Sequence, residues 1–287
     1  MKSAREWKVY YAEERAELGD AGLSALLDRA PRVELPKGGA LVFPHTRLRR
    51  SGELPAAVAA AVVREGCEEV VALGILHGAR EQDASLVRRA REGAPSARGS
   101  LRRVHGPDTS GDAGYWAEEF SLDNFVALTE VAAARAGRKP PRILLRYPFL
   151  VGEHPADVPG VAELRTRLDQ GAVLVATADP IHHGAGYGAR EEDRLPLEDP
   201  QTLEFARWTI ERGFRLLADR DFGAFLRHCA DVRSDFRDTG PLLAWLVDPA
   251  KRIQVELLDL LLVDYSEALS APAPTWVAGA LARFERA

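Results

Sequence analysis

The sequence predicts an α/β fold, a single three-layer domain in which helices flank both faces of a central mixed sheet. Short apolar runs alternate with amphipathic segments through most of the 287 residues, which is the order expected of strand–helix–strand units. No internal repeat or low-complexity linker divides the chain. We therefore expect one domain over residues 1–287, with residues 1–35 as an N-terminal extension packed on it.

The first part of the chain supplies two strand–helix pairs. A helix is expected within 20–30, where Leu23, Leu26 and Leu27 recur at helical spacing, and "GGALVF" reads as a buried strand that stops at Pro44. The alanine-rich segment 53–67 has proline near its start and Gly66 near its end, as helices do. The run "EEVVALGILHG" is a second buried strand.

The rest of the chain continues this alternation after a polar excursion over 79–116. Helices are expected at 121–137, with Ser121 as N-cap and Gly137 as stop, and at 158–171, 200–221, 222–232 and from 240. Strands are expected at 142–152 and 172–180. The runs at 255–269 and 275–284 fit terminal strands, although short apolar runs also suit helices.

Composition excludes several classes of function. The formal net charge of −5 and the scattered arginines give no basic footprint for nucleic acid. No strand is followed by a glycine-rich phosphate loop, which argues against nucleotide binding.

The charged N-terminus does not resemble a signal peptide, and the longest apolar run is broken by acids, so we expect a cytoplasmic protein without membrane contact. Cys67 and Cys229 form no CxxC motif and are expected as free thiols. A homodimer is as compatible with this composition as a monomer.

Histidines follow three of the predicted strands. His45 ends "ALVFPH", His77 ends "VVALGILH", and His182 and His183 end "AVLVATADPIHH". Ligands of open α/β sheets bind outside the carboxyl ends of the strands. Four of the chain's seven histidines therefore predict one shared site. His105, His154 and His228 are interpreted as surface or packing residues.

Asp179 lies three residues before His182 and has two possible roles. Its carboxylate could orient the imidazole and select its tautomer. Alternatively, it caps a turn, since Asp before Pro commonly starts one. His183 is interpreted as a neighbour, and Tyr187 as a residue that packs under the loop.

Several motifs, in order over roughly residues 35–285, resemble those of Memo-like proteins. The segments that carry the resemblance are "PHTRLRRSG", "VVALGILHG", "EEFSLDNF", "LVATADPIHHGAGYG", "TGPLLAWL" and "LLVDYSEA". The resemblance implies the LigB-like fold of class III extradiol dioxygenases, which open catechol rings with non-haem iron. The bacterial branch of the family is described as AmmeMemoRadiSam system protein B.

The resemblance also implies roles for individual residues. His45 and His77 match two metal-pocket histidines, His182 matches the acid/base histidine, and Asp179 matches the acid before it. The third ligand is a glutamate in the dioxygenases and a cysteine in Memo proteins. Here the corresponding stretch, "RSDFRDTGP", contains neither.

Departures from the family's motifs leave the third ligand open. Arg237 falls at the cysteine position, and either Asp235 or Asp238 could supply a carboxylate, unless the site is incomplete. Asp238 could instead cap the next helix. Phe120 replaces a family histidine, and Ile75-Leu76 replace Pro-Ser, which predicts a more apolar pocket.

The expected function is a metal-dependent, dioxygenase-like enzyme acting on a small, aromatic or related compound. Two imidazoles and a carboxylate suit Fe(II), with zinc or copper as alternatives. His182 would be the acid/base. The alternative is a non-catalytic Memo homologue that binds a small ligand or peptide, and a weaker third hypothesis is hydrolytic zinc chemistry.

Overall fold

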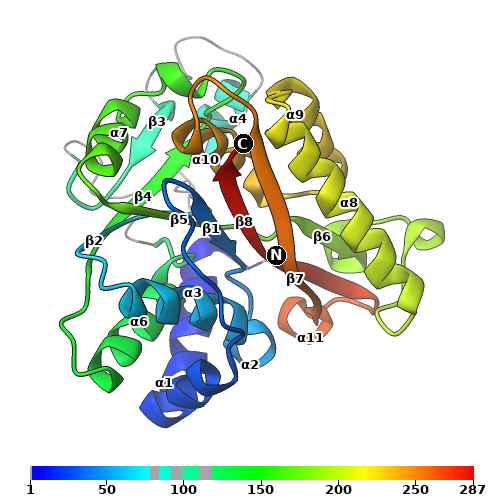
Figure 1. Cartoon of the computed structure of the whole chain (residues 1–287). Helices are drawn as coiled ribbons and strands as arrows, with labels where there is room; N and C mark the ends of the chain where they lie inside the picture. Colours follow the sequence, from blue (N-terminus) through cyan, green and yellow to red (C-terminus); the bar gives the residue numbers. More distant parts are fainter. Residues whose placement is uncertain (1, 78–83, 92–98, 100, 110–117) are drawn as a thin grey trace.

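The computed structural model confirms the three-layer α/β fold with a mixed central sheet (Figure 1). It describes residues 2–77, 84–91, 99, 101–109 and 118–287. The described strands form one eight-stranded sheet in the order β3-β4-β2-β5-β1-β8-β6, and β7 pairs with β8. The strands are β1 (Ala40–Phe43), β2 (Glu69–Leu73), β3 (Arg103–His105), β4 (Arg142–Phe149), β5 (Val173–Thr177), β6 (Ile181–Gly184), β7 (Ile253–Asp264) and β8 (Thr275–Arg286).

The centre of the sheet is parallel and its margins are antiparallel. β4, β2, β5 and β1 run in one direction, with β5 inserted between β2 and β1. β8 runs against β1 and β6, and also against β7 along almost its whole length. The two terminal apolar runs are thus strands, as predicted. They form strands because each hydrogen-bonds to the other along almost its whole length.

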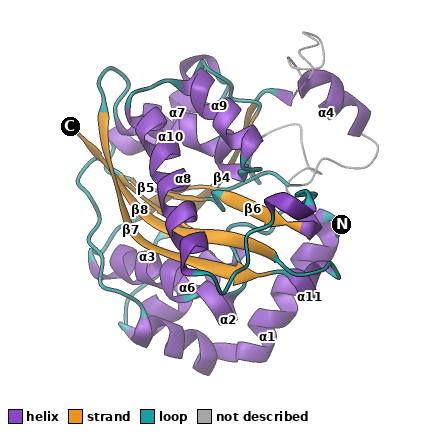
Figure 2. Cartoon of the chain, turned by 90° about the vertical axis from the view of Figure 1, so that its right-hand side faces the viewer, coloured by secondary structure: helices purple, strands orange, loops and turns teal. Residues whose placement is uncertain are grey.

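Helices cover both faces of the sheet (Figures 1 and 2). One face carries α1 (Ala4–Arg29), α2 (Leu48–Ser51), α3 (Glu53–Arg64) and α6 (Asp123–Arg135). The opposite face carries α7 (Val161–Asp169), α8 (Pro200–Ala218), α9 (Phe222–Asp231) and α10 (Thr239–Val247). Short helices α4 (Ala84–Arg91) and α11 (Ser266–Leu269) lie at the periphery.

Alternating side chains of the parallel strands feed two separate cores. Along β1, Leu41 and Phe43 join the core under α1, α3 and α6, whereas Ala40 and Val42 join the core under α7 to α10. Strands buried on both faces are apolar at successive positions rather than at every second one. This explains the continuous apolar runs in the sequence.

The N-terminal segment is more structured than a polar lead-in with one short helix. α1 begins at Ala4 under a capping box formed by Ser3 and Glu6, and Gly19, with φ +56°, interrupts its helical geometry. The predicted 20–30 helix is only its second half. Tyr11 is buried against the body of the protein, so the aromatic residues of the first half contribute to its packing.

The polar excursion contributes to the core where it is described. Parts of it, residues 79–83, 92–98, 100 and 110–116, lie outside the described residues. Val87 and Leu101 are buried in the core beneath α3 and α6. His105 lies in β3 rather than in a loop, and its Nε2 lies 3.1 Å from the Leu101 carbonyl oxygen, so it has a packing role.

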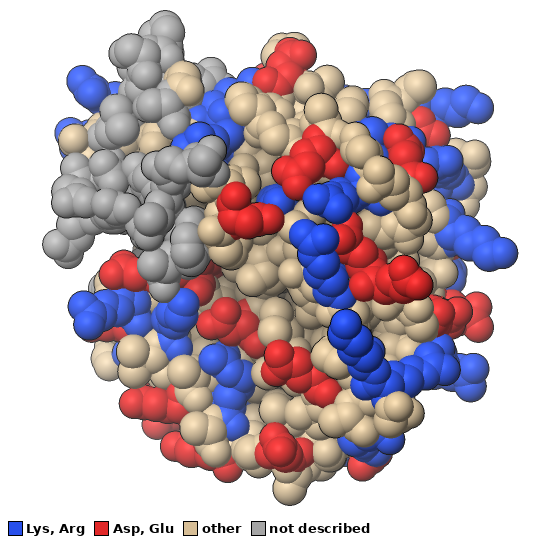
Figure 3. Space-filling model, turned by 90° about the vertical axis from the view of Figure 1, so that its left-hand side faces the viewer, with Lys and Arg blue, Asp and Glu red and all other residues tan. Residues whose placement is uncertain are grey.

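Within the described residues, no helix combines the length and apolar character needed to cross a membrane. One face of the molecule, shown in Figure 3, carries acidic and basic side chains side by side rather than in separate patches. Cys67 and Cys229 are free thiols, as expected, and Cys229 is buried in α9.

The contact between Phe43 and Phe125 allows a prediction about the stability of the fold. Phe125 is fully buried and stacks on Phe43 with ring centroids 4.8 Å apart. We expect Phe125→Ala to lower the free energy of unfolding by about 3–5 kcal/mol, through lost burial and a cavity. Urea denaturation measures this. Phe205→Ala is the matched control because Phe205 is a helical residue with 40% exposure, and its expected change is about 0.5 kcal/mol. Equal losses in both variants would contradict the assignment of Phe125 to the core.

Candidate metal centre

The candidate site lies at the carboxyl edge of three neighbouring parallel strands. His45 follows β1, His77 follows β2, and Asp179 follows β5, which lies between them. A fourth residue, Asp235, arrives on the short 3₁₀ helix η5 (Asp235–Arg237), between α9 and α10. Parallel strands place their carboxyl ends at one edge, which is why residues far apart in sequence meet here.

Three of these side chains converge on a common point. The Asp235 Oδ2 atom lies 3.3 Å from His45 Nε2 and 4.0 Å from His77 Nε2. The ligand atoms of His45, His77 and Asp235 all lie within 4.8 Å of one another. Asp235 Oδ2 is buried and accepts no hydrogen bond in the described chain. A buried carboxylate oxygen without a donor, facing two imidazoles, is suited to a cation.

Hydrogen bonding leaves His45 with its Nε2 lone pair free. The Thr177 hydroxyl donates to the Phe43 carbonyl at 2.8 Å, so its oxygen can accept from His45 Nδ1 at 3.2 Å. The proton of neutral His45 is thereby assigned to Nδ1. Its Nε2, which faces Asp235, is then the atom that can bind a metal.

Glu119 acts on His77 in the same way. Its Oε1 accepts from His77 Nδ1 at 3.0 Å, and its Oε2 accepts from the His77 backbone N–H at 2.6 Å. Burial alone would raise the pKa of Glu119, but the His77 imidazole outweighs burial and lowers it. The ionised carboxylate therefore orients the ring and leaves Nε2 as the ligand atom.

Phe120 and Ser121 complete the support of His77. The Phe120 ring stacks on the His77 ring, with centroids 4.5 Å apart. Ser121 Oγ accepts from the Ile75 backbone N–H and donates to the Ile75 carbonyl. The prediction that Ser121 caps α6 is therefore wrong, since Leu122 holds the N-cap position without a side-chain bond. The hydroxyl instead ties down the loop that carries His77.

His182 lies beside this centre as a neutral base. Its Nδ1 lies 2.8 Å from the Arg233 carbonyl, which only accepts, so Nδ1 carries the proton and Nε2 has the lone pair. Burial lowers the pKa of His182. The edge of the Tyr187 ring packs against it, with centroids 4.9 Å apart, in accord with the packing role expected for Tyr187.

Asp179 is placed close to His182 but serves His45. Its Oδ1 accepts the His45 backbone N–H at 3.2 Å, and its Oδ2 lies 3.6 Å from His45 Nε2. The role of orienting His182, expected for Asp179, is filled by the Arg233 carbonyl. Asp179, His182 and Asp235 form a second compact group of potential ligands. The first group is favoured because both of its imidazoles present a free Nε2 to Asp235.

Among the described residues, imidazole is the only cationic group that faces the carboxylates of the cluster. Asp179, Asp235 and Glu119 have only imidazoles, and no Lys or Arg, as ion-pair partners among the described residues. Burial raises the pKa of Asp179 to about 7, and Asp235 adds to the rise. Burial alone would lower the pKa of His45, but Asp179 and Asp235 raise it to about 9. A divalent metal would displace the His45 proton and compensate the carboxylates.

Of the two aspartates considered as the third ligand, Asp235 lies with His45 and His77, and Asp238 does not belong to that group. Burial alone would raise its pKa, but the surrounding imidazoles, His45 foremost, lower it, so the carboxylate is ionised. Asp238 accepts the backbone N–H of Val151 at 2.9 Å. It occupies the N-cap position of α10 without a capping bond, so the alternative role of helix cap is not borne out.

Two supporting residues were missed by reasoning from the sequence. Glu119 stands directly before Phe120 in a quoted motif, and Thr177 lies two residues before Asp179 at the end of β5. The signal available for Glu119 was its position directly before Phe120 in the motif "EEFSLDNF". His183 stacks on Trp276 and accepts from the Leu195 N–H, so it is a neighbour, as expected.

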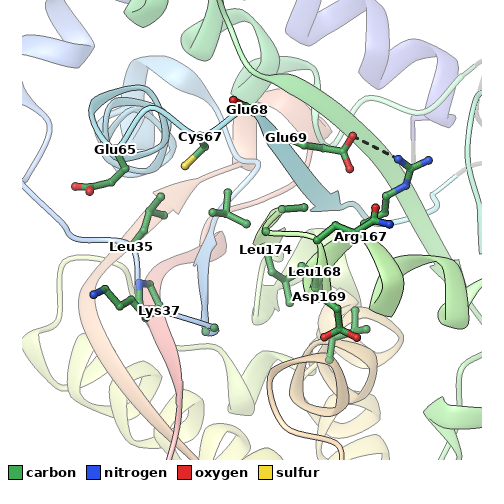
Figure 4. A pocket seen from close by; sticks show the side chains of 18 of the residues that line it. Leu35, Lys37, Glu65, Cys67, Glu68, Glu69, Arg167, Leu168, Asp169 and Leu174 are labelled. Carbon is green, nitrogen blue, oxygen red and sulfur yellow. Dashed lines mark ion pairs between the residues drawn. The ribbon is translucent and has the colours of Figure 1, made fainter.

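A larger cavity, of about 810 Å³, opens at the opposite edge of the sheet, near the amino ends of the parallel strands (Figure 4). Its Arg167 pairs with Glu69, and Cys67 lies half-buried on its wall with a pKa raised by burial. The described residues there include no group of convergent metal ligands. Size alone therefore does not mark the functional site, and the chemistry points to the histidine edge.

Comparison of the chain with protein-family models and with curated proteins finds no match. The interpretation of the site therefore depends on its geometry and on the motifs in the sequence.

Glu119→Gln tests the support of His77. The amide oxygen of the new side chain can still accept the hydrogen bond from His77. The substitution removes the negative charge that makes the His77 imidazole a stronger metal ligand. We expect metal affinity to fall about 10–100-fold. Competition with a fluorescent zinc chelator measures it. Glu118→Gln removes the neighbouring charge as control and should leave affinity unchanged. Equal affinities of Glu119→Gln and wild type would exclude this role for Glu119.

Metal-induced stabilisation should increase with pH. The pKa of His45 in the metal-free fold, about 9, exceeds its ordinary value of 6.5. Its proton therefore stabilises the metal-free fold fully below about 6.5, and this stability is lost as the pH rises through about 9. A metal must displace that proton, so its effect on the melting temperature should grow by several degrees over this range. Thermal melts with and without zinc test this, and a pH-independent difference would contradict it.

Proposed function

We propose that the chain is a non-haem metal-dependent enzyme with extradiol-dioxygenase-like chemistry on a small, aromatic or related compound. The observation that carries the proposal is the buried Asp235 Oδ2 atom, which lacks a hydrogen bond and faces the free Nε2 atoms of His45 and His77. Two imidazoles and one carboxylate are the ligand set of non-haem Fe(II) oxygenases, in which iron supplies dioxygen activation at open coordination positions. Zinc and copper are alternative occupants.

The chain's own contribution to the chemistry is a positioned base. The Arg233 carbonyl holds the His182 proton on Nδ1, and a lowered pKa keeps the ring neutral near pH 7. His182 Nε2 can then accept a proton from a hydroxyl of the bound compound and return it later. General acid–base catalysis of this kind contributes about 10²–10⁴-fold in rate.

The motifs shared with Memo-like proteins support the same proposal. The matched residues His45, His77, Asp179 and His182 lie together at one edge of the sheet, on an α/β fold. Asp235, two residues before the position at which Memo proteins have a cysteine, would supply the carboxylate that the dioxygenases take from a glutamate. A non-catalytic Memo homologue is the second candidate. It is favoured by the departure at Arg237 and is distinguished by the absence of turnover.

Metal analysis of purified variants tests the proposal. Protein reconstituted with Fe(II) under anaerobic conditions should hold about one ion per chain, and Asp235→Asn, His45→Ala and His77→Ala should retain only a small fraction. Asp238→Asn is the matched control for Asp235→Asn and should retain the metal. His182→Gln should also retain the metal but lose about 10²–10⁴-fold in turnover of a catechol followed by oxygen uptake.

Two results would decide against the proposal in different ways. Unchanged iron content in Asp235→Asn, His45→Ala and His77→Ala would exclude this metal centre. Stoichiometric iron in the wild type without oxygen uptake for any catechol would favour the non-catalytic alternative.

A further inference from the structure

A small cavity adjoins the candidate metal centre. Its volume is about 200 Å³. Two of the candidate metal ligands, His77 and Asp235, form part of its wall. The apolar walls are Ile75, Leu76, Pro148 and Phe149. Ligand pockets usually measure about 300–1,000 Å³, so this one suits a compact ligand with a single ring.

Arg237 also lines this cavity, and its side chain has no partner among the described residues. It is partly buried, yet it makes no hydrogen bond or ion pair in the described structure. Arg146 shows the contrast, since its buried guanidinium pairs with both Asp108 and Glu163. A guanidinium has five donors and is always charged, so that of Arg237 can donate to an acceptor that enters the cavity.

The two carboxylates on the same cavity wall are already engaged. Asp238 accepts the Val151 backbone N–H, and Asp235 accepts the Asp179 backbone N–H through Oδ1 and faces two imidazoles through Oδ2. Neither forms an ion pair with Arg237. The guanidinium thus remains available to a group that enters from outside.

We propose that Arg237 binds the carboxylate of a small ring compound whose other end reaches the metal centre. This inference rests on the proposed function, because it assigns the metal-binding end of the ligand to His45, His77 and Asp235. A guanidinium matches a carboxylate through two parallel hydrogen bonds, and such charge-assisted pairs are about twice as strong as neutral ones. The apolar walls enclose the ring between the two anchored ends.

Calorimetry on zinc-loaded protein in oxygen-free buffer tests the inference with two probes of similar size. The probes are 3,4-dihydroxybenzoate and 4-methylcatechol, which differ in the charge of one ring substituent. Wild type should bind the carboxylate about tenfold or more tightly. Arg237→Gln should abolish this preference while zinc content stays the same, and Arg237→Lys should retain part of it. Arg50→Gln, at an exposed arginine on α2, should behave as wild type.

The outcomes separate this inference from the proposed function. Stoichiometric zinc together with equal affinities for the two probes, or with a preference that survives in Arg237→Gln, would overturn the role of Arg237 alone. A wild type that binds no zinc would overturn the metal centre and, with it, the assigned ligand.

Discussion

The parallel pairing of β2, β5 and β1 is the constraint on which the rest of the site depends. Because β5 lies between the other two strands, Asp179 is held between the loops that carry His45 and His77. β strands lie about 4.8 Å apart, so residues at neighbouring strand ends can share one metal. The two helical layers bury both faces of these strands, which leaves the strand edge as the place where polar side chains can gather.

Each imidazole in the site is held by a different kind of acceptor, and this distinguishes their chemistry. A hydroxyl holds His45, a carboxylate holds His77, and a backbone carbonyl holds His182. In the neutral form of all three, the assigned proton is on Nδ1 and the lone pair is on Nε2, and His45, whose pKa is about 9, must first lose its second proton. The negative charge of Glu119 would make His77 a stronger metal ligand, whereas burial lowers the pKa of His182 and keeps its ring neutral near pH 7. The proposed ligands and the proposed base are thus the same residue type, distinguished by the groups around each ring.

Asp235 links the two parts of the centre. Its Oδ1 accepts the Asp179 backbone N–H at 2.8 Å, which connects η5 to the end of β5, and its Oδ2 faces the metal position. The residues that follow continue into the adjoining cavity, where Arg237 provides a positive charge. A single turn of 3₁₀ helix therefore carries both a proposed metal ligand and a proposed ligand anchor.

The sequence by itself determined the layer order and the strand ends, because apolar runs of strand length and helix stops at Gly66 and Gly137 are local signals. It also identified His45 and His77 as residues that follow strands, whereas His182 and His183, predicted at a strand end, lie within the separate strand β6. Only the tertiary structure decided that Asp235 rather than Asp238 faces them, and that Glu119 supports His77. These contacts join segments 42 or more residues apart, and no local pattern specifies which carboxylate of a polar loop points inward. Burial, backbone donors and the neighbouring rings select it.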